Sequence, residues 1–255
     1  MKTDLGLAGA VVLVTGGVRG VGRGISDVFL AHGARVVTCA RHETATKAEF
    51  VQCDVRDEAQ VTALIDGIVE RYGRLDVVVN NAGGAPYAPA ADASPRLHDK
   101  IVQLNLLAPL LVSQRANAVM QRQSTGGSIV MISSVSGTRA SPGTAAYGAA
   151  KAGLDNLTAS LAVEWAPKVR VNALDVGMVR TEQSHLHYGS EAAIEAVGKT
   201  VPLGRLAEPE EVGACAAFLA SGLASYVSGA TLRVHGGGEV PAFLAAADVN
   251  QREDS

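Results

Sequence analysis

The amino-acid sequence predicts an α/β fold, in which a doubly wound parallel sheet of about seven strands carries helices on both faces. Short apolar segments alternate along the chain with segments of helical periodicity. The apolar segments are continuous rather than alternating, as expected of parallel strands covered on both faces. A chain of 255 residues can bury one sizeable core, so we expect a single domain over residues 1–255.

The expected elements follow one another in regular order. Strands are predicted at residues 11–14, 35–39, 50–53, 75–79, 128–132, 169–173 and 231–234. Helical periodicity is clearest at residues 59–72, 100–122, 149–165 and 211–219. The tail at 241–255 loses periodicity and becomes polar at its end, so we expect its last residues to be mobile.

A glycine-rich turn at residues 15–22 joins the first strand to a helical pattern through Ile25. Gly16 permits a tight turn, and Gly20 lets the backbone approach a pyrophosphate. Gly22 lets the helix pack closely on the strand, while the amino end of the helix faces the anion. Strand, turn and helix together predict a nucleotide site.

Tyr147 and Lys151 lie four residues apart in an alanine-rich segment, so they share one helix face. A fixed cation beside a phenol stabilises the phenolate and moves the hydroxyl toward acid/base chemistry. Ser134 follows the apolar segment at 128–132 and places a hydroxyl at the carboxyl end of a strand, where ligands of open α/β sheets bind.

In this order, the segments closely resemble the short-chain dehydrogenase/reductase family, in its single-domain branch of roughly 250 residues. The resemblance extends from residue 11 to about 238. Its markers are the turn at 15–22, Asp54-Val55, Asn80-Asn81-Ala82-Gly83, Asn105, Ser134, Tyr147, Lys151, Val171-Asn172-Ala173 and Pro202-Leu203-Gly204-Arg205. The resemblance implies a Rossmann-type fold, in which Ser134, Tyr147 and Lys151 are catalytic and Asn105 holds a water beside Lys151. Asn105 could instead only lock its helix.

The turn and the family positions together imply a nicotinamide cofactor. Its expected contacts are Gly16, Arg19, Gly20, Val21, Gly22, Arg41, Asp54, Val55, Asn81, Ala82, Gly83, Tyr147, Lys151, Val179 and Thr181. Asp54 would accept from the adenine amino group, or it could act only as a turn residue.

The choice of cofactor is predicted at the end of the second strand. An NAD-selective site usually has an acid there, but Ala40 takes that place and Arg41 follows. A guanidinium can bind a 2′-phosphate bidentately, so NADP(H) is favoured, with Arg19 as the second basic position. Both arginines could instead be solvated loop residues, and Glu43 leaves NAD(H) possible.

Two positions depart from the family pattern. Val176 stands where the family commonly has proline, and loss of the fixed φ is expected to loosen the following loop. His235 replaces the usual acid before paired glycines. Neither change touches the acid/base residues, so we expect altered loop or subunit geometry with retained chemistry.

The pocket walls are expected at residues 84–91, 136–144 and 178–200, the last being a mobile substrate loop. Their side chains, which include Tyr87, Arg139, Met178, Leu186 and Tyr188, suit a medium-sized ketone or alcohol. Arg139 or Arg180 could meet an anionic substrate, although solvated surface is the better interpretation. His185 and His187 lack a third ligand, so no metal is expected.

Charge and cysteine content point to a small-molecule partner. The formal net charge is −3, without a lysine or arginine run that would indicate a nucleic-acid or membrane surface. Cys39, Cys53 and Cys215 lack metal-ligand spacing and indicate reduced core thiols in a cytoplasmic protein. No signal peptide or membrane-spanning stretch is expected.

The family resemblance implies a homotetramer. Apolar residues on more than one face of two helices agree with this expectation, because a partner subunit could cover some of them. They include Leu106, Leu110, Leu154, Leu157 and Leu161.

Three functions are compatible with these residues. The first is an NADP(H)-dependent carbonyl reductase or secondary-alcohol dehydrogenase. The second is a 3-oxoacyl-acyl-carrier reductase, which a basic face near the pocket mouth would favour. The third is a nucleotide-sensing protein without chemistry, which would not need Ser134, Tyr147 and Lys151 together.

Overall fold

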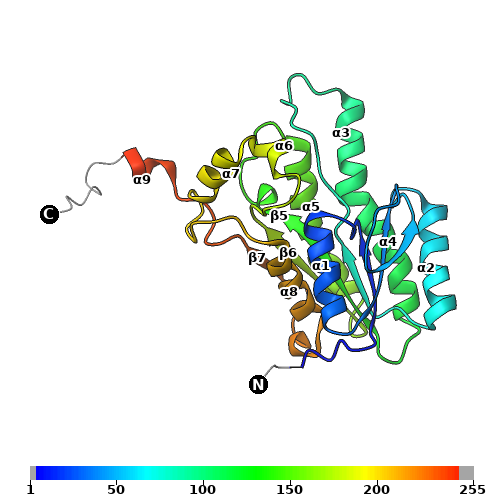
Figure 1. Ribbon diagram of the computed structural model, residues 1–255. Coiled ribbons are helices and arrows are strands. Elements are labelled where there is room, and N and C mark those ends of the chain that lie inside the picture. Colours follow the sequence, from blue (N-terminus) through cyan, green and yellow to red (C-terminus); the bar gives the residue numbers. More distant parts are fainter. Residues whose placement is uncertain (1–3, 247–255) are drawn as a thin grey trace.

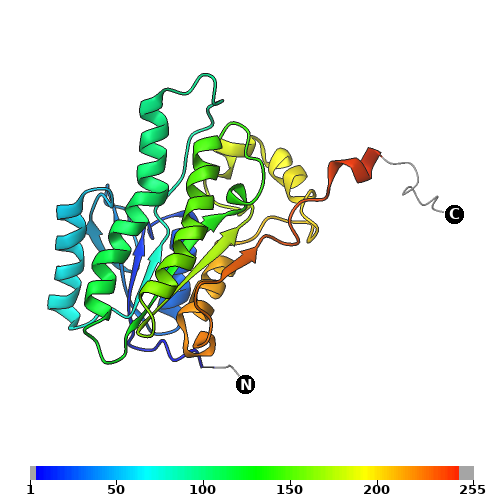
Figure 2. The same ribbon diagram turned by 180° about the vertical axis from the view of Figure 1, so that it is seen from behind.

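The computed structural model describes residues 4–246. Its strands form one parallel sheet in the order β3-β2-β1-β4-β5-β6-β7, which confirms the predicted fold class. Figures 1 and 2 show the sheet between two layers of helices. The strands are β1 (Val11–Thr15), β2 (Arg35–Ala40), β3 (Glu49–Gln52), β4 (Val77–Asn80), β5 (Gly127–Ser134), β6 (Val169–Val176) and β7 (Thr231–Val234).

Helices connect the strands and cover both faces of the sheet. They are α1 (Gly20–Ala31), α2 (Glu58–Tyr72), α3 (Pro95–Val102), α4 (Ala108–Met120), α5 (Ala145–Glu164), α6 (Ser184–Tyr188), α7 (Glu191–Gly198), α8 (Pro209–Ala220) and α9 (Ala242–Ala246). A π-helical segment, η1 (Gln103–Leu107), and two short 3₁₀ segments, η2 (Val135–Gly137) and η3 (Gly222–Ala224), complete the set.

Two hydrophobic cores lie on the opposite faces of the sheet. Val11 and Leu13 of β1 face the core under α2, α4 and α5. Val12 and Val14, which alternate with them along the strand, face the core under α1 and α8. This alternation explains the continuous apolar character of the strand segments, since both faces are buried.

Several predicted boundaries were wrong. The helix expected over 100–122 is three segments, α3, η1 and α4, and it starts earlier, at Pro95. Two helices, α6 and α7, occupy the expected loop at 178–200, and α9 forms in the tail, where no periodicity was recognised. Residues 247–255, for which we expected mobility, lie outside the described part of the chain.

The order of the strands determines where a ligand can bind. The chain leaves β1 for β2 on one side, whereas β4 pairs with β1 on the other side. Ligands of open α/β sheets bind at such a switch point, outside the carboxyl ends of the strands. The glycine turn after β1, the asparagines that end β4 and follow it, and Ser134 at the end of β5 therefore meet at one edge.

The structure corrects the expectation for Val176. The residue is buried and ends β6, where it pairs with Val234 of β7. Beyond it, the Gly177 amide donates to the Val234 carbonyl at 2.9 Å, so β6 is longer than predicted and the ladder continues where we expected a looser loop.

Candidate active site

The glycine turn is formed by close contacts that leave no room for side chains. A Cβ atom on Gly22 would lie 2.3 Å from the Gly16 carbonyl oxygen and 2.4 Å from Asn81 Nδ2. Gly16 has φ of +65° and Gly20 has φ of +49°, which glycine adopts most readily. Arg19 caps α1 without a side-chain hydrogen bond, and no acidic residue lies in the first turn. The amino end of α1 thus suits an external anion such as a dinucleotide phosphate.

Asn81 fastens this turn to the end of β4. Its Nδ2 atom donates to the carbonyl oxygens of Thr15 at 3.0 Å and Gly16 at 3.2 Å. The Thr15 hydroxyl accepts from the backbone amides of Asn81 and Ala82, each at 3.0 Å. The neighbouring Asn80 turns inward and donates to Ser113 at 2.8 Å. The two amides therefore hold different elements in place.

Asn105 sits in the π-helical segment η1 and is completely buried. Its Nδ2 atom donates to the carbonyl oxygens of Gly84 at 3.0 Å and Ile101 at 2.9 Å, and its Oδ1 atom accepts from the Gly84 amide at 2.9 Å. Pro109, four residues later, has no amide hydrogen for the Asn105 carbonyl. Both hydrogens of the side-chain amide are used, so a water beside Lys151 would have to donate to an oxygen of Asn105, either the side-chain Oδ1 or the backbone carbonyl.

Gly83 marks the place where Asn105 and Lys151 approach each other. A Cβ atom on Gly83 would lie 2.8 Å from Asn105 Oδ1 and 3.5 Å from Lys151 Nζ. Glycine is therefore favoured here, because a side chain would displace the Asn105 oxygen. Residues from β4, η1 and α5 meet at this point.

Lys151 is buried, with a relative exposure of 4%. Its ammonium group donates to the Ile132 carbonyl at 2.7 Å and lies 5.5 Å from the centre of the Tyr147 ring. Burial disfavours the charged form and lowers the pKa of Lys151 to about 8, although the nearby carboxylate of Asp155 opposes this shift.

Tyr147 faces Ser134 across the gap between α5 and β5. The Ser134 hydroxyl also accepts from the Ser136 amide at 3.2 Å, which fixes its position. Burial raises the pKa of Tyr147, and a hydrogen bond with Ser134 opposes this shift. The expected lowering of the Tyr147 pKa by Lys151 was wrong for this arrangement, because the ammonium group is directed at Ile132.

Two acids that we did not predict lie near the predicted catalytic residue Lys151 and near each other. Asp155, one turn after Lys151, and the fully buried Asp175 of β6 each have a buried Oδ1 atom without a hydrogen-bond partner among the described residues. Burial raises the pKa of both carboxyl groups. The Asp175 carboxylate lies 3.8 Å from Arg233 Nε, and both Arg233 and His235 oppose the rise of its pKa. An acid is therefore present near His235, in β6 rather than at position 235 itself.

The expected adenosine end of the site carries three arginines. Arg19 and Arg41 are exposed and form no ion pair with any described residue. Arg56, which we did not predict, donates to both oxygens of Asp54, at 2.9 and 2.6 Å. This pairing lowers the pKa of Asp54, to which Arg41 contributes. Val55 is buried beside it.

Three side chains of the expected pocket walls have partners within the chain. Tyr87 lies against Gly143, where a Cβ atom would be 2.0 Å from the Tyr87 ring. Arg139 forms an ion pair with Glu239 at 2.7 Å, and Arg180 forms one with Glu191. Both arginines are therefore neutralised by acids of the chain.

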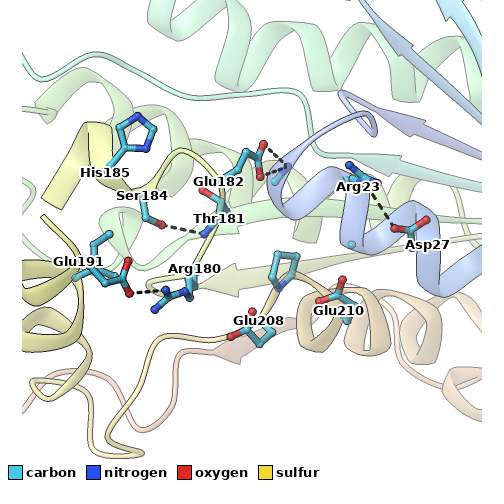
Figure 3. Close-up of a pocket in the computed structure, with 14 residues that line it drawn as sticks. Arg23, Asp27, Arg180, Thr181, Glu182, Ser184, His185, Glu191, Glu208 and Glu210 are labelled. Carbon is cyan, nitrogen blue, oxygen red and sulfur yellow. Dashed lines mark hydrogen bonds and ion pairs between the residues drawn. The ribbon is translucent and has the colours of Figure 1, made fainter. Parts of the chain in front are cut away.

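A cavity of about 530 Å³ lies between α1 and the segment that follows β6 (Figure 3), and two predicted cofactor contacts, Gly20 and Thr181, line it. It is bordered by α1, by residues 180–185 and by the starts of α7 and α8, and none of the four predicted catalytic residues lines it. Glu182, at its edge, accepts a hydrogen bond from the Gly20 amide. Sequence reasoning missed Glu182, because no local pattern reveals a contact across 162 positions.

No group of three metal-binding side chains occurs among residues 4–246, so His185 and His187 stay without a third ligand there. Within the same range, no helix has the length and apolar character needed to span a bilayer. Cys39, Cys53 and Cys215 are free thiols, of which Cys39 lies in β2 and Cys53 directly follows β3.

The chain is similar to known enzymes over most of its length. A family model described as enoyl-(acyl carrier protein) reductase matches residues 16–239. D-threitol dehydrogenase of Mycolicibacterium smegmatis is 35% identical over 247 residues, which cover 92% of this chain and 94% of that protein. L-fucose dehydrogenase of Oryctolagus cuniculus is 38% identical over 254 residues, which cover 94% of this chain and 88% of that protein.

A solved structure has the same fold. The ligand-free aldohexose dehydrogenase (AldT) of Thermoplasma acidophilum superimposes with a TM-score of 0.88 at 34% sequence identity. The match covers 92% of this chain and 96% of that chain.

Proposed function

This chain belongs to the short-chain dehydrogenase/reductase family and is an NAD(P)-dependent dehydrogenase acting on CH–OH groups, and we propose that it interconverts a polyhydroxylated secondary alcohol and its ketone, with NADP(H) as the preferred cofactor. The observation that carries the proposal is the meeting of Lys151 and Asn105 at Gly83, one strand away from Ser134 and beside the glycine turn.

Each of the four residues has a role that its surroundings support. When bound, the nicotinamide dinucleotide supplies hydride transfer to or from the reacting carbon. Ser134 donates a hydrogen bond to the substrate oxygen, and Tyr147 exchanges a proton with that oxygen. The Lys151 ammonium lies 5.5 Å from the centre of the Tyr147 ring and would stabilise the phenolate once it turns there from the Ile132 carbonyl. An oxygen of Asn105 would hold the water through which the proton reaches solvent.

Residues around the glycine turn would hold the dinucleotide. The amino end of α1 would receive the pyrophosphate, Asp54 the adenine, and Val179 with Thr181 the nicotinamide end. Lys151 would also contact the ribose. Glycines at 16, 20, 22 and 83 keep the space that these contacts require.

The preference for NADP(H) is supported by charge at the end of β2. Ala40 ends this strand without a carboxylate, and the next residue, Arg41, has no acid partner among the described residues. Arg19 is similarly free at the start of α1. Free guanidinium groups favour a 2′-phosphate over a 2′-hydroxyl.

A polyhydroxylated substrate is supported by the names of the relatives, which act on threitol, fucose and aldohexoses. An acyl-carrier substrate has weaker support, although the family model carries that description. A basic face near the pocket mouth would favour a carrier protein, but Arg139 and Arg180, the arginines of the expected pocket walls, already pair with acids of the chain. The same pairing disfavours an anionic small substrate.

A spectrophotometric screen tests the proposed function. Polyols, aldoses and simple secondary alcohols are offered with NADP⁺ and with NAD⁺, ketones with the reduced cofactors, and an acetoacetyl thioester as the acyl-carrier surrogate. We expect nicotinamide reduction with a polyol or sugar, faster with NADP⁺. Turnover of the thioester alone would favour the acyl-carrier function, and dinucleotide binding without any turnover would favour a sensing protein.

Two further properties belong to the proposal. We expect a homotetramer, because large apolar side chains stay exposed on the described surface, and we expect the enzyme to work in the cytoplasm, where its three thiols stay reduced. Leu154 and Leu161 cannot contribute to a subunit interface, since both are buried in the core of the single chain.

A further inference from the structure

Glu182 places a carboxylate at the amino end of α1. Its Oε1 and Oε2 atoms accept from the Gly20 amide at 3.1 and 3.3 Å, as Figure 3 shows. Gly20 is the first residue of this helix of 12 residues, and the cap residue Arg19 makes no side-chain hydrogen bond. An anion is stabilised at such a helix end, so the chain itself supplies one where a dinucleotide phosphate is expected.

The hydrogen bond between Glu182 and Gly20 attaches the segment at residues 179–184 to the glycine turn. Val179 forms a bridge with Ala207, which pins the start of the segment. The Thr181 amide donates to Ser184 Oγ at 2.9 Å, and the Thr181 methyl group lies 3.4 Å from the position a Cβ atom would take on Gly20. Glu182 is thus held directly over the start of α1, by its carboxylate.

Among the described residues, the Gly20 amide is the one group that hydrogen-bonds with the Glu182 carboxylate, which forms no ion pair. The cavity it borders also contains Glu191, Glu208 and Glu210. Its two arginines are engaged, because Arg180 pairs with Glu191 and Arg23 with Asp27. Among the described residues, the Gly20 amide is therefore the favourable contact for this carboxylate.

We propose that Glu182 occupies the anion position at the start of α1 in the cofactor-free protein and is displaced by the phosphates of the dinucleotide. The inference rests on the proposed function, since it takes the glycine turn to be the dinucleotide site. A phosphate bound at the Gly20 amide would repel the Glu182 carboxylate, so the two groups cannot occupy this position together. Glu182 is a positioning residue: it lowers the affinity for the cofactor and keeps residues 181–184 against the turn until the cofactor arrives.

The displacement links the cofactor to the substrate pocket. Residues 181–184 lead directly into α6, which belongs to the expected substrate loop. Release of Glu182 frees this segment when the dinucleotide binds.

The test compares two isosteric variants in the same cavity. Glu182→Gln removes the charge and weakens the acceptor, whereas Glu210→Gln removes an equal charge that makes no hydrogen bond with Gly20. We expect Glu182→Gln to bind NADP⁺ and NAD⁺ about three- to tenfold more tightly by calorimetric titration, which corresponds to about 0.7 to 1.4 kcal/mol. Glu210→Gln should stay within about twofold of the parent. A merely structural role for Glu182 would predict weaker binding.

Hydrogen exchange gives a second readout that needs no cofactor. Peptides covering residues 179–188 should exchange faster in cofactor-free Glu182→Gln than in the parent, while Glu210→Gln should match the parent. Unchanged or weaker dinucleotide binding by Glu182→Gln, or unchanged exchange in this segment, overturns the inference and leaves the proposed function intact. Absence of dinucleotide binding in the parent overturns the proposed function itself.

Discussion

The ammonium group of Lys151, which we propose is needed for catalysis, is unfavourable for folding. Burial moves its pKa from 10.5 to about 8, so the folded chain holds the charge less readily than the unfolded chain. At pH below 8, both states are protonated and the shift costs about 3 kcal/mol of folding free energy. The hydrogen bond from the ammonium to the Ile132 carbonyl offsets part of this free-energy cost.

A variant that lacks only the Lys151 ammonium makes this cost in folding free energy measurable. Lys151→Met should lose activity, while its free energy of unfolding at pH 7 should exceed that of the parent by about 1 to 3 kcal/mol. Between pH 8 and 10.5, Lys151 of the parent is protonated in the unfolded state but not in the folded state, so the parent gains stability as pH rises. The difference in the free energy of unfolding between Lys151→Met and the parent should therefore shrink in that range. Urea denaturation at pH 7, 9 and 10 measures it. A variant less stable than the parent at every pH would refute the cost.

The phenol of Tyr147 is expected to act as the proton carrier. Tyr147→Phe keeps the ring but removes the exchangeable proton, so turnover should fall at least about a hundredfold while cofactor affinity stays nearly intact. Steady-state kinetics and calorimetric titration check the two parts. Tyr72→Phe, which removes a phenol bonded to Glu49 far from the site, should keep full turnover. Activity of Tyr147→Phe within threefold of the parent would rule out this role.

The guanidinium of Arg41 is expected to select the cofactor. Arg41→Ala should weaken NADPH binding by about 1.5 to 3 kcal/mol, as expected for a charge-assisted hydrogen bond, and leave NADH nearly unaffected. Adding Ala40→Asp should reverse the preference, because the new carboxylate accepts from the NADH ribose and repels the phosphate. Arg122→Ala, another exposed arginine, is the control. Equal affinity of the parent for NADH and NADPH, by calorimetry, would show that Arg41 is only a solvated loop residue.

Single residues were predictable where the chemistry is local. Tyr147 and Lys151 share a helix face by spacing alone, and Ser134 follows from the end of a strand. Glu182 and Asp175 were not predictable, since their surroundings come from distant segments. The raised pKa of Tyr147 could not be predicted from the sequence either, because the direction of the Lys151 ammonium depends on the position of the Ile132 carbonyl.

At the scale of elements, helix periodicity predicted the location of most helices but not their hydrogen-bond pattern. The segment at 100–122 keeps its apolar period through η1, so nothing in the period indicates the π-helical turn. Pro109 was the available signal, because a proline inside a helix removes the donor for the carbonyl four residues earlier. Asn105 is placed by this irregular turn rather than by a regular helix.

The contact between α1 and α8 depends on glycines and gives a prediction for these elements. A Cβ atom on Gly213 would lie 2.8 Å from the Gly24 carbonyl oxygen and from Val28 Cγ2, whereas Gly67 in α2 has nothing within 4 Å. Gly213→Ala should therefore destabilise by about 1 to 3 kcal/mol, despite the better helix propensity of alanine. Gly67→Ala should stabilise by about 0.5 to 1 kcal/mol. Urea denaturation of both variants checks this, and equal effects would show that packing at α1 and α8 does not matter.

For the whole molecule, the fold class and all seven strands could be predicted, but the strand order could not. Periodicity identifies each strand but not the strand that pairs with it. The pairing of β1 with β4, which creates the switch point, can be seen only in the assembled sheet. The family resemblance implied a Rossmann-type, doubly wound sheet, but we did not predict the order of its strands. It also supplied the tetramer, for which a single chain offers only indirect support.

That support comes from apolar side chains on two parts of the surface. Leu107 of η1 and Val163 of α5, the latter 81% exposed, lie on the helices that follow β4 and β5. Phe218, Leu223, Tyr226 and Leu232 lie on α8, η3 and β7, or on the loop between them, at the opposite edge of the sheet from β3. Tyr226 is fully exposed in the single chain, which is unfavourable for so large a ring.

Two separate surfaces predict an assembly of dihedral symmetry, because each would form a different two-fold interface. Light scattering should give four times the chain mass for the parent. Val163→Asp and Tyr226→Asp should each break one interface and leave a dimer held by the other, since a buried charge without a partner is strongly unfavourable. Leu203→Asp, at an exposed leucine outside both surfaces, should remain a tetramer. A monomeric parent would refute the assembly, and a tetramer that survives both substitutions would show that neither surface forms it.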